Sequence, residues 1–160
     1  MLNIEFENFP NELIPVIQKL HDKYSMWYPK WVQTITYEYR HLKTDNEDTV
    51  AENYTSYPYR RIHINIFSTF LVTKDKYREE IFIHELFHSF SGVFTIPAYD
   101  IIEKLIEDEK FKHIIISELM ERVEGFTQDL AYSLNNFINN NNENPKQEIK
   151  RQITTKPSQE

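Results

Sequence analysis

Residues 84–88, near the middle of the chain, read His-Glu-Leu-Phe-His and lie in an apolar run without proline or glycine. The run predicts a buried helix, on which His84 and His88 fall one turn apart on the same face and can hold one metal ion. Glu85 is then placed to take a proton from water at that metal. Imidazole and carboxylate groups are costly inside an apolar helix unless something satisfies them. The pattern therefore predicts a zinc site that hydrolyses peptide or similar amide bonds; the alternative is two ordinary histidines bonded to backbone or water.

A catalytic zinc ion usually takes three protein ligands and leaves a fourth position for water. The third ligand must come from elsewhere in the chain, and Glu124 is the preferred candidate. Gly125 follows it, and a glycine that costs about 1 kcal/mol in a helix interior makes sense where the helix approaches a metal closely. Glu121 lies three residues earlier on nearly the same face, so it could ligate instead or support the site from outside. The alternative for both is a solvated glutamate on an exposed face.

The hydrogen bonds of the histidines suggest a further pair of residues. A histidine that ligates a metal normally donates its second N–H to a carboxylate or carbonyl oxygen. Gln128 and Asp129 lie about one turn beyond Glu124, so either side chain could accept such a bond. Exposure of both side chains to solvent is an equally good interpretation.

Length and composition limit the class of protein. The 160 residues suffice for one hydrophobic core, and we expect a single domain over residues 1–138 and a polar, disordered tail over residues 139–160. The net charge of −7 argues against a nucleic-acid partner, because an acidic protein repels phosphate. The lack of cysteine rules out Cys zinc ligands and fits a reducing compartment. No apolar stretch could span a membrane and residues 1–10 do not resemble a signal peptide, so we expect a cytoplasmic protein; its oligomeric state is open.

Alternating and helical patterns predict the secondary structure. Strands are expected at residues 31–40, 50–56 and 60–67, with a polar turn at residues 44–48, and together they suggest a small antiparallel meander. Helices are expected at residues 11–24, 73–91, 97–110 and 113–138, with Thr73 or Asp75 as the N-cap of the second, Gly92 as its C-cap and Pro97 opening the third.

With strands before the His-Glu-Leu-Phe-His motif and Glu124-Gly125-Phe126-Thr127-Gln128-Asp129-Leu130-Ala131 after it, the chain resembles the minimal gluzincin-type zinc metallopeptidases. These are small proteins, often encoded by phages or mobile elements, and the resemblance covers about residues 31–134. It implies a zincin-like α+β fold, in which a three-stranded antiparallel sheet packs on the motif helix and on a later helix that carries the ligand glutamate.

The same resemblance implies roles for particular residues. His84, His88 and Glu124 are expected to bind Zn²⁺, and Glu85 is expected to be the catalytic base. One edge of the sheet, for which residues 60–67 are the candidate, is expected to hold an extended substrate by strand addition.

Two features depart from the larger relatives. The aspartate often found four residues after the ligand glutamate is replaced by Gln128, and Asp129 follows one position later. No histidine or tyrosine clearly matches their oxyanion-stabilising residue, and the candidates are His63, His113, Tyr54, Tyr57, Tyr59 and Tyr99.

The sequence therefore predicts a zinc metalloendopeptidase, a hydrolase with a peptide or protein substrate and a narrow specificity. The first alternative is a zincin-fold module or regulator that binds a protein partner, keeps zinc for stability and cleaves little. The intact Glu85 argues against that alternative, because a structural zinc site needs no base. A helical interaction domain without metal is the second alternative.

Overall fold

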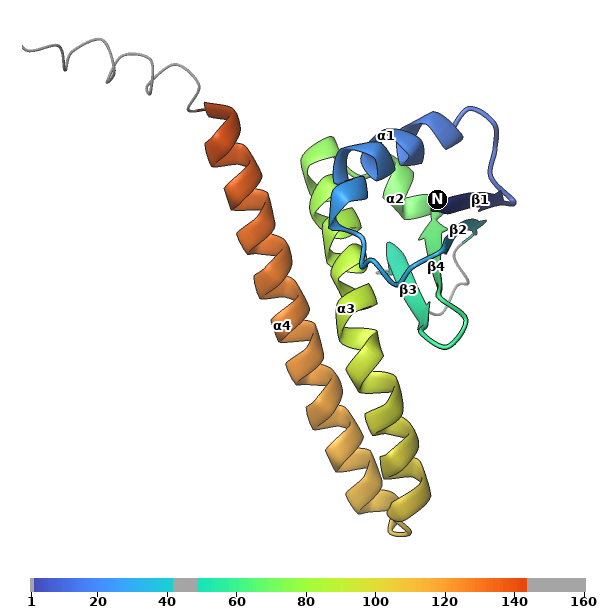
Figure 1. Ribbon diagram of the computed structural model, residues 1–160, viewed down its shortest axis with the longest axis vertical. Coiled ribbons are helices and arrows are strands. Elements are labelled where there is room, and N and C mark those ends of the chain that lie inside the picture. The colour runs from blue at the N-terminus through green and yellow to red at the C-terminus, as the bar shows by residue number, and fades with distance from the viewer. Residues whose placement is uncertain (1, 42–48, 144–160) are drawn as a thin grey trace, which may run out of the picture.

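A computed structural model describes residues 2–41 and 49–143, which form one mixed sheet and a set of helices (Figure 1). The predicted α+β class is confirmed. None of the described helices has the length and apolar character that crossing a bilayer requires. The strands are β1 (Asn3–Glu7), β2 (Thr34–Arg40), β3 (Ala51–Ser56) and β4 (Arg61–Phe67), and the helices are α1 (Ile14–Tyr24), the 3₁₀ helix η1 (Ser25–Trp27), α2 (Ser68–Val72), α3 (Asp75–Leu105) and α4 (Glu109–Glu143).

The sheet has the strand order β1-β2-β4-β3, so the predicted three-stranded antiparallel meander is wrong. β1, β2 and β4 run parallel, and only β3 is antiparallel to its neighbour β4. The cause is the difference in apolar content between the last two strands. Ile62, Ile64 and Ile66 of β4 are at most 1% exposed, so this strand takes a central position. The more polar β3 lies at the edge, and residues 60–67 are therefore not the edge strand.

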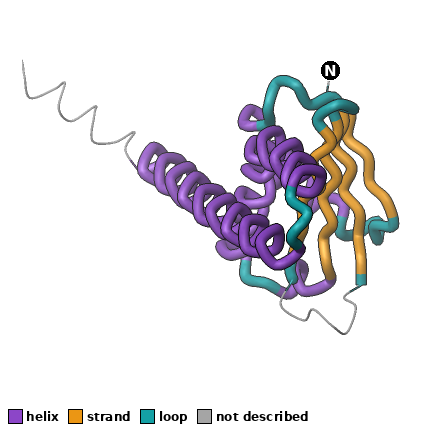
Figure 2. The backbone as a smooth tube through the Cα atoms, turned by 90° about the horizontal axis from the view of Figure 1, so that it is seen from below, coloured by secondary structure: helices purple, strands orange, loops and turns teal. Residues whose placement is uncertain are grey.

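The first strand, β1, was not predicted from the sequence. It pairs with β2 in parallel, and α1 provides the crossover that a parallel pair needs. Its side chains do follow a strand pattern, because Ile4 and Phe6 pack against the core while Asn3, Glu5 and Glu7 are exposed. Figure 2 shows helices gathered on one side of the strands, with the opposite side of the sheet uncovered by helices.

The motif-bearing half of α3 packs into the core against the inner face of the sheet. Phe82, Ile83 and Leu86 are at most 1% exposed and contact the buried isoleucines of β4 within one core cluster. The predicted helix over residues 73–91 is therefore present. Its N-cap residue is Lys74, without a side-chain hydrogen bond, rather than Thr73 or Asp75.

α3 continues much further than the sequence predicts, to Leu105. Gly92 does not end the helix, and it has no positive φ. It is instead the point of closest approach to β3, since a Cβ atom at Gly92 would lie 2.8 Å from Thr55 Cβ. Pro97 lies inside the helix rather than opening a new one. An interior proline removes one helical hydrogen bond and its ring crowds the carbonyl group four residues earlier, a cost that the packing of α3 on α4 helps to offset.

α4 begins at Glu109 and runs back alongside α3 to Glu143 (Figure 1). Asp108 caps it, because one carboxylate oxygen accepts hydrogen bonds from the backbone N–H groups of Lys110 and Phe111, both at 2.9 Å. The helix extends past residue 138, so the first residues of the predicted tail are helical. The rest of that tail and the predicted turn at residues 44–48 lie outside the described residues.

The two glycines predict opposite responses to alanine. Gly92→Ala forces the backbones of α3 and β3 apart, which we expect to cost about 1–3 kcal/mol and to exceed the roughly 1 kcal/mol gain in helix propensity. Gly125→Ala should stabilise the protein by up to about 1 kcal/mol, because no atom lies within 4 Å of its added Cβ. Urea unfolding of both variants measures the difference, and stabilisation by Gly92→Ala would contradict the close contact.

Candidate metal centre

The helix α3 places the two motif histidines side by side. His84 and His88 lie one turn apart, with 19% of each side chain exposed, and their Nε2 atoms are 3.0 Å apart. Burial lowers the pKa of His88 below its ordinary value, which favours a neutral ring. Two neutral imidazoles that direct Nε2 toward a common point are a typical donor pair for a transition metal.

Glu124 reaches the same point from α4. Its Oε2 atom lies 3.3 Å from His84 Nε2, and its Oε1 atom lies 3.4 Å from His88 Nε2. Within the described part of the chain, Glu121 has no ion pair with either histidine, so the geometry favours Glu124 over its rival. Gly125 has no atom near its missing side chain, so the reason first given for choosing Glu124 is wrong.

The separations between these atoms suit one zinc ion. Tetrahedral zinc with bonds of about 2.0–2.2 Å places its ligand atoms about 3.3–3.6 Å from one another. The two Nε2 atoms are 3.0 Å apart, and the distances of 3.3 and 3.4 Å join them to different oxygens of Glu124. The carboxylate would therefore bind the ion through both oxygens, or turn to present one of them. One shared proton could join the two histidines, but it would leave the Glu124 carboxylate facing a nitrogen lone pair. A cation at the common point would satisfy all three groups at once.

Gln128 bonds to the ring nitrogen of His84 that faces away from His88 and Glu124. The Nδ1 atom of His84 lies 3.0 Å from Gln128 Oε1, and this bond requires Nδ1 to carry the proton. The Nε2 lone pair of His84 is then free to face Glu124 and His88. Of the two residues predicted to accept this bond, the structure thus places Gln128 in position, whereas Asp129 is exposed and forms no hydrogen bond or ion pair with His84 among the described residues.

Glu85 is buried beside the histidines, with only 7% of the residue exposed. One carboxylate oxygen lies within 4.8 Å of a ligand nitrogen of both His84 and His88, so Glu85 is itself a possible ligand. The contacts of Glu124 with the two histidines, at 3.3 and 3.4 Å, favour Glu124 as the third candidate ligand, with Glu85 beside it. Burial, and then the charges of Glu124 and Glu52, raise its pKa to about 8. A cation bound to the histidines acts in the opposite direction.

The edge strand β3 is tied to the motif through Asn53, a residue that the sequence analysis did not identify. Its Nδ2 group donates to the backbone oxygen of Glu85 at 2.6 Å and to Ser89 Oγ at 3.1 Å. The sequence carried a signal, because Asn53 falls between Ala51 and Thr55 on the alternating face of the strand that packs on α3. These bonds fix the distance between the edge of the sheet and the motif helix.

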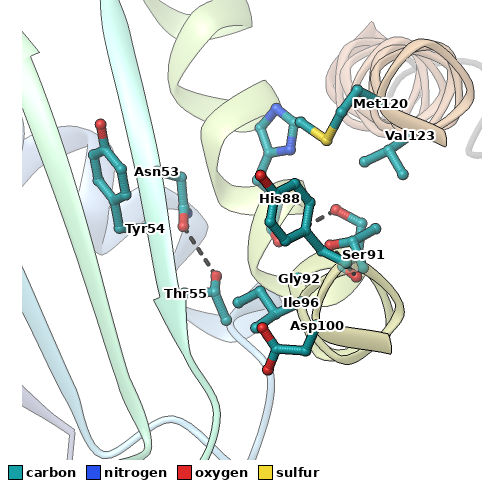
Figure 3. Close-up of a pocket in the computed structure, with 12 residues that line it drawn as sticks. Asn53, Tyr54, Thr55, His88, Ser91, Gly92, Ile96, Asp100, Met120 and Val123 are labelled. Carbon is teal, nitrogen blue, oxygen red and sulfur yellow. Dashed lines mark hydrogen bonds between the residues drawn. The ribbon is translucent and has the colours of Figure 1, made fainter. Parts of the chain in front are cut away.

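Two hollows flank the metal-binding group along α3. One, of about 280 Å³, adjoins His88 and lies between β3 and the two long helices (Figure 3). The other, of about 400 Å³, adjoins His84 and Glu85 and is lined on one side by Thr49, Val50 and Ala51. The histidines therefore lie between two recesses that follow the edge of β3.

The candidates for an oxyanion-stabilising residue differ in their positions and hydrogen bonds. His63 is bonded to Glu38 at 2.9 Å, on the sheet face that is turned away from α3. The Tyr54 hydroxyl donates to Glu52 at 2.9 Å, whereas Tyr57, Tyr59 and His113 are exposed and do not line the hollow beside His88. Tyr99 lines that hollow and forms no hydrogen bond within the described residues, but it follows His88 by 11 positions, about 16 Å along α3. None of the six candidates is therefore placed at the histidines.

Loss of the Gln128 contact should weaken metal binding without removing a ligand. We expect Gln128→Ala to lower zinc affinity by about 10- to 100-fold, because His84 loses the bond that fixes its tautomer and orientation. Competition with a chromophoric chelator measures the change. Asp129→Ala is the matched control and should bind zinc as the wild type does; equal affinity of all three proteins would contradict the role of Gln128.

Glu85 should make the chelator-treated protein less stable as the pH rises. The folded protein keeps the Glu85 proton up to about pH 8, whereas the unfolded chain releases it near the ordinary pKa of 4.5. The free energy of unfolding therefore falls between these values. We expect Glu85→Gln to raise the melting temperature, more at pH 8 than at pH 5. An increase independent of pH, or one matched by the exposed control Glu121→Gln, would contradict this.

Comparison with known proteins finds no matching family model, no similar curated protein and no similar solved structure. The roles of His84, Glu85, His88 and Glu124 therefore rest on the residues and their geometry alone. What that geometry provides is a donor set for one cation, an adjacent buried carboxyl group and a recess on each side.

Proposed function

We propose that the protein is a zinc-dependent metallopeptidase. The observation that carries the proposal is the convergence of His84, His88 and Glu124, whose donor atoms are separated by 3.0 to 3.4 Å. Two different helices, α3 and α4, contribute these atoms, so the arrangement is not simply a consequence of helical periodicity. The motif alone places two histidines together, but it does not bring a carboxylate from α4 to meet them.

The chain's own residues suffice for the remaining chemistry. A zinc ion held by the three ligands supplies a Lewis acid that polarises a carbonyl group and acidifies water. Glu85 accepts a proton from the water as its oxygen bonds to the carbonyl carbon. Glu85 then gives this proton to the nitrogen of the leaving amine as the C–N bond breaks. The base ends in its starting form, and one water molecule is consumed for each bond cleaved.

The surrounding fold supports a peptide substrate, and we propose that its arrangement is zincin-like. A motif helix lies under the sheet, a later helix supplies a glutamate, and an edge strand borders the cleft between them. Among the described strands, β3 pairs only with β4, which leaves its other edge able to bond an extended peptide. The strand proposed to hold substrate is therefore β3 rather than residues 60–67.

Metal analysis and cleavage mapping test the proposal together. We expect about one zinc per chain in the wild type, in Glu85→Gln and in the control Glu121→Ala, and loss of zinc in His84→Ala and Glu124→Ala. Incubation with proteome-derived peptides, followed by mass spectrometry of new N-termini, should reveal cleavage by the wild type. Glu85→Gln should be at least about 100-fold slower, because it keeps the metal but lacks the base.

Other outcomes have separate meanings. Wild-type protein without stoichiometric metal would contradict the proposal. Cleavage at the wild-type rate by Glu85→Gln would show that the mechanism is wrong. Zinc binding without any cleavage would favour the alternative, a protein-binding module that keeps zinc for stability.

A further inference from the structure

The hollow beside His88 combines apolar lining with a single charged group. Its lining includes Gly92 and Ile96 of α3 and Met120 and Val123 of α4. Ile96 and Met120 are 43% and 45% exposed, so apolar surface is open to whatever enters. The only carboxylate of its lining, which holds no lysine or arginine, is Asp100, and Figure 3 shows it at the end of the lining away from His88 and Met120.

Asp100 has no partner of its own within the described residues. Its carboxylate forms no hydrogen bond or ion pair there, although Lys104 lies one turn further along the same helix. Lys112, a basic residue near the start of α4, is held by Glu103 at 3.3 Å and by Glu109 at 2.8 Å. A negatively charged group that can bind a cation is therefore left available at the rim of an apolar recess.

The two hollows and the metal-binding group between them together carry negative charge. Neither hollow is lined by a lysine or an arginine, whereas Glu80 and Glu85 line the recess on the His84 side. Glu124 adds a further carboxylate at the centre, and one zinc ion would offset only part of this negative charge. A positively charged segment complements such a cleft, and an acidic segment would be repelled.

The lining of the recess suits a side chain with an aliphatic stem and a cationic end. Lysine and arginine lay their stems along apolar surface while the charged end reaches a polar group or water. We propose that the hollow beside His88 is a subsite for a lysine or arginine of the peptide substrate, and that Asp100 selects its charge. This inference rests on the proposed peptidase function for the identity of the ligand as a peptide.

The position of that basic residue follows from the length of the helix. Asp100 follows His88 by 12 positions, which is about 18 Å along α3. β3 runs beside α3 in the same direction, since Asn53 contacts Glu85 and Thr55 meets Gly92 further along. An extended peptide beside β3 covers 18 Å with about five residues. Because a long side chain spans part of this distance, the basic residue should lie about three or four positions from the cleaved bond.

Binding of a side-chain analogue tests the subsite without any need for turnover. Zinc-loaded protein is titrated with butylguanidinium and with butylurea, its neutral planar counterpart, while NMR follows the amide signals of Gly92, Ile96 and Val123. We expect saturable shifts for both, with butylguanidinium tighter by about 2- to 5-fold at low salt, as for a partly exposed ion pair. The preference should shrink with added salt.

Matched variants locate the source of the preference. Asp100→Asn should abolish the difference between the two analogues, whereas Asp129→Asn, the same change at an exposed site on α4, should leave it intact. Equal binding of the two analogues by the wild type, or an unchanged preference in Asp100→Asn, would overturn the inference. Shifts confined to residues outside the hollow would also overturn it.

Cleavage mapping distinguishes failure of this subsite from failure of the peptidase function. An active enzyme should cut with lysine or arginine enriched three or four residues from the bond on one side, and Asp100→Lys should lose that enrichment. Activity without enrichment would reject the subsite and keep the peptidase. Selective analogue binding by a protein that cleaves nothing would keep the recess as a site for basic side chains and reject the peptidase.

Discussion

The contact between α3 and β3 is the constraint on which the rest of the structure depends. Gly92 allows the helix and the strand to approach until a single added methyl group would collide with Thr55. Asn53 secures the same interface by donating to the backbone of Glu85, within the motif itself. The distance from the sheet edge to the histidines is thus set by backbone packing and by one short side chain, not by flexible groups. Any peptide that pairs with β3 would lie at a fixed height above the motif.

Electrostatics at the centre provides a second argument for a cation. Glu85 is buried near two further carboxylates, Glu124 and Glu52, and its raised pKa records the cost of ionising it there. No lysine or arginine lines the recess on either side to offset this charge. A chain selected only for stability would gain from an apolar residue at this point. The carboxyl group of Glu85 beside two histidines agrees with the divalent ion and the catalytic base that we propose.

Local patterns predicted the parts of the structure that depend on local spacing. The placement of His84 and His88 follows from one helical turn, and Gln128 was one of two residues expected behind them. Glu124 does approach the histidines, but not for the reason inferred from Gly125. The strand order was missed because it depends on which strand is most apolar across the whole sheet. β1 was overlooked although Ile4 and Phe6 alternate with Asn3, Glu5 and Glu7, a signal only five residues long.

The length of α3 was the most consequential error, because both helix-ending signals were overridden by packing. Gly92 and Pro97 are typical residues of a helix end, yet one faces a strand and the other lies where α4 supports the helix. Continuity of the helix has a functional consequence. His84, His88 and Asp100 all belong to α3, so the distance between the two histidines and Asp100 is set by one helix. Because one helix carries both the histidines and Asp100, the proposed cleft would fix the number of residues between a basic residue and the bond to be cleaved. Such a fixed spacing fits a narrow specificity better than a general digestive role.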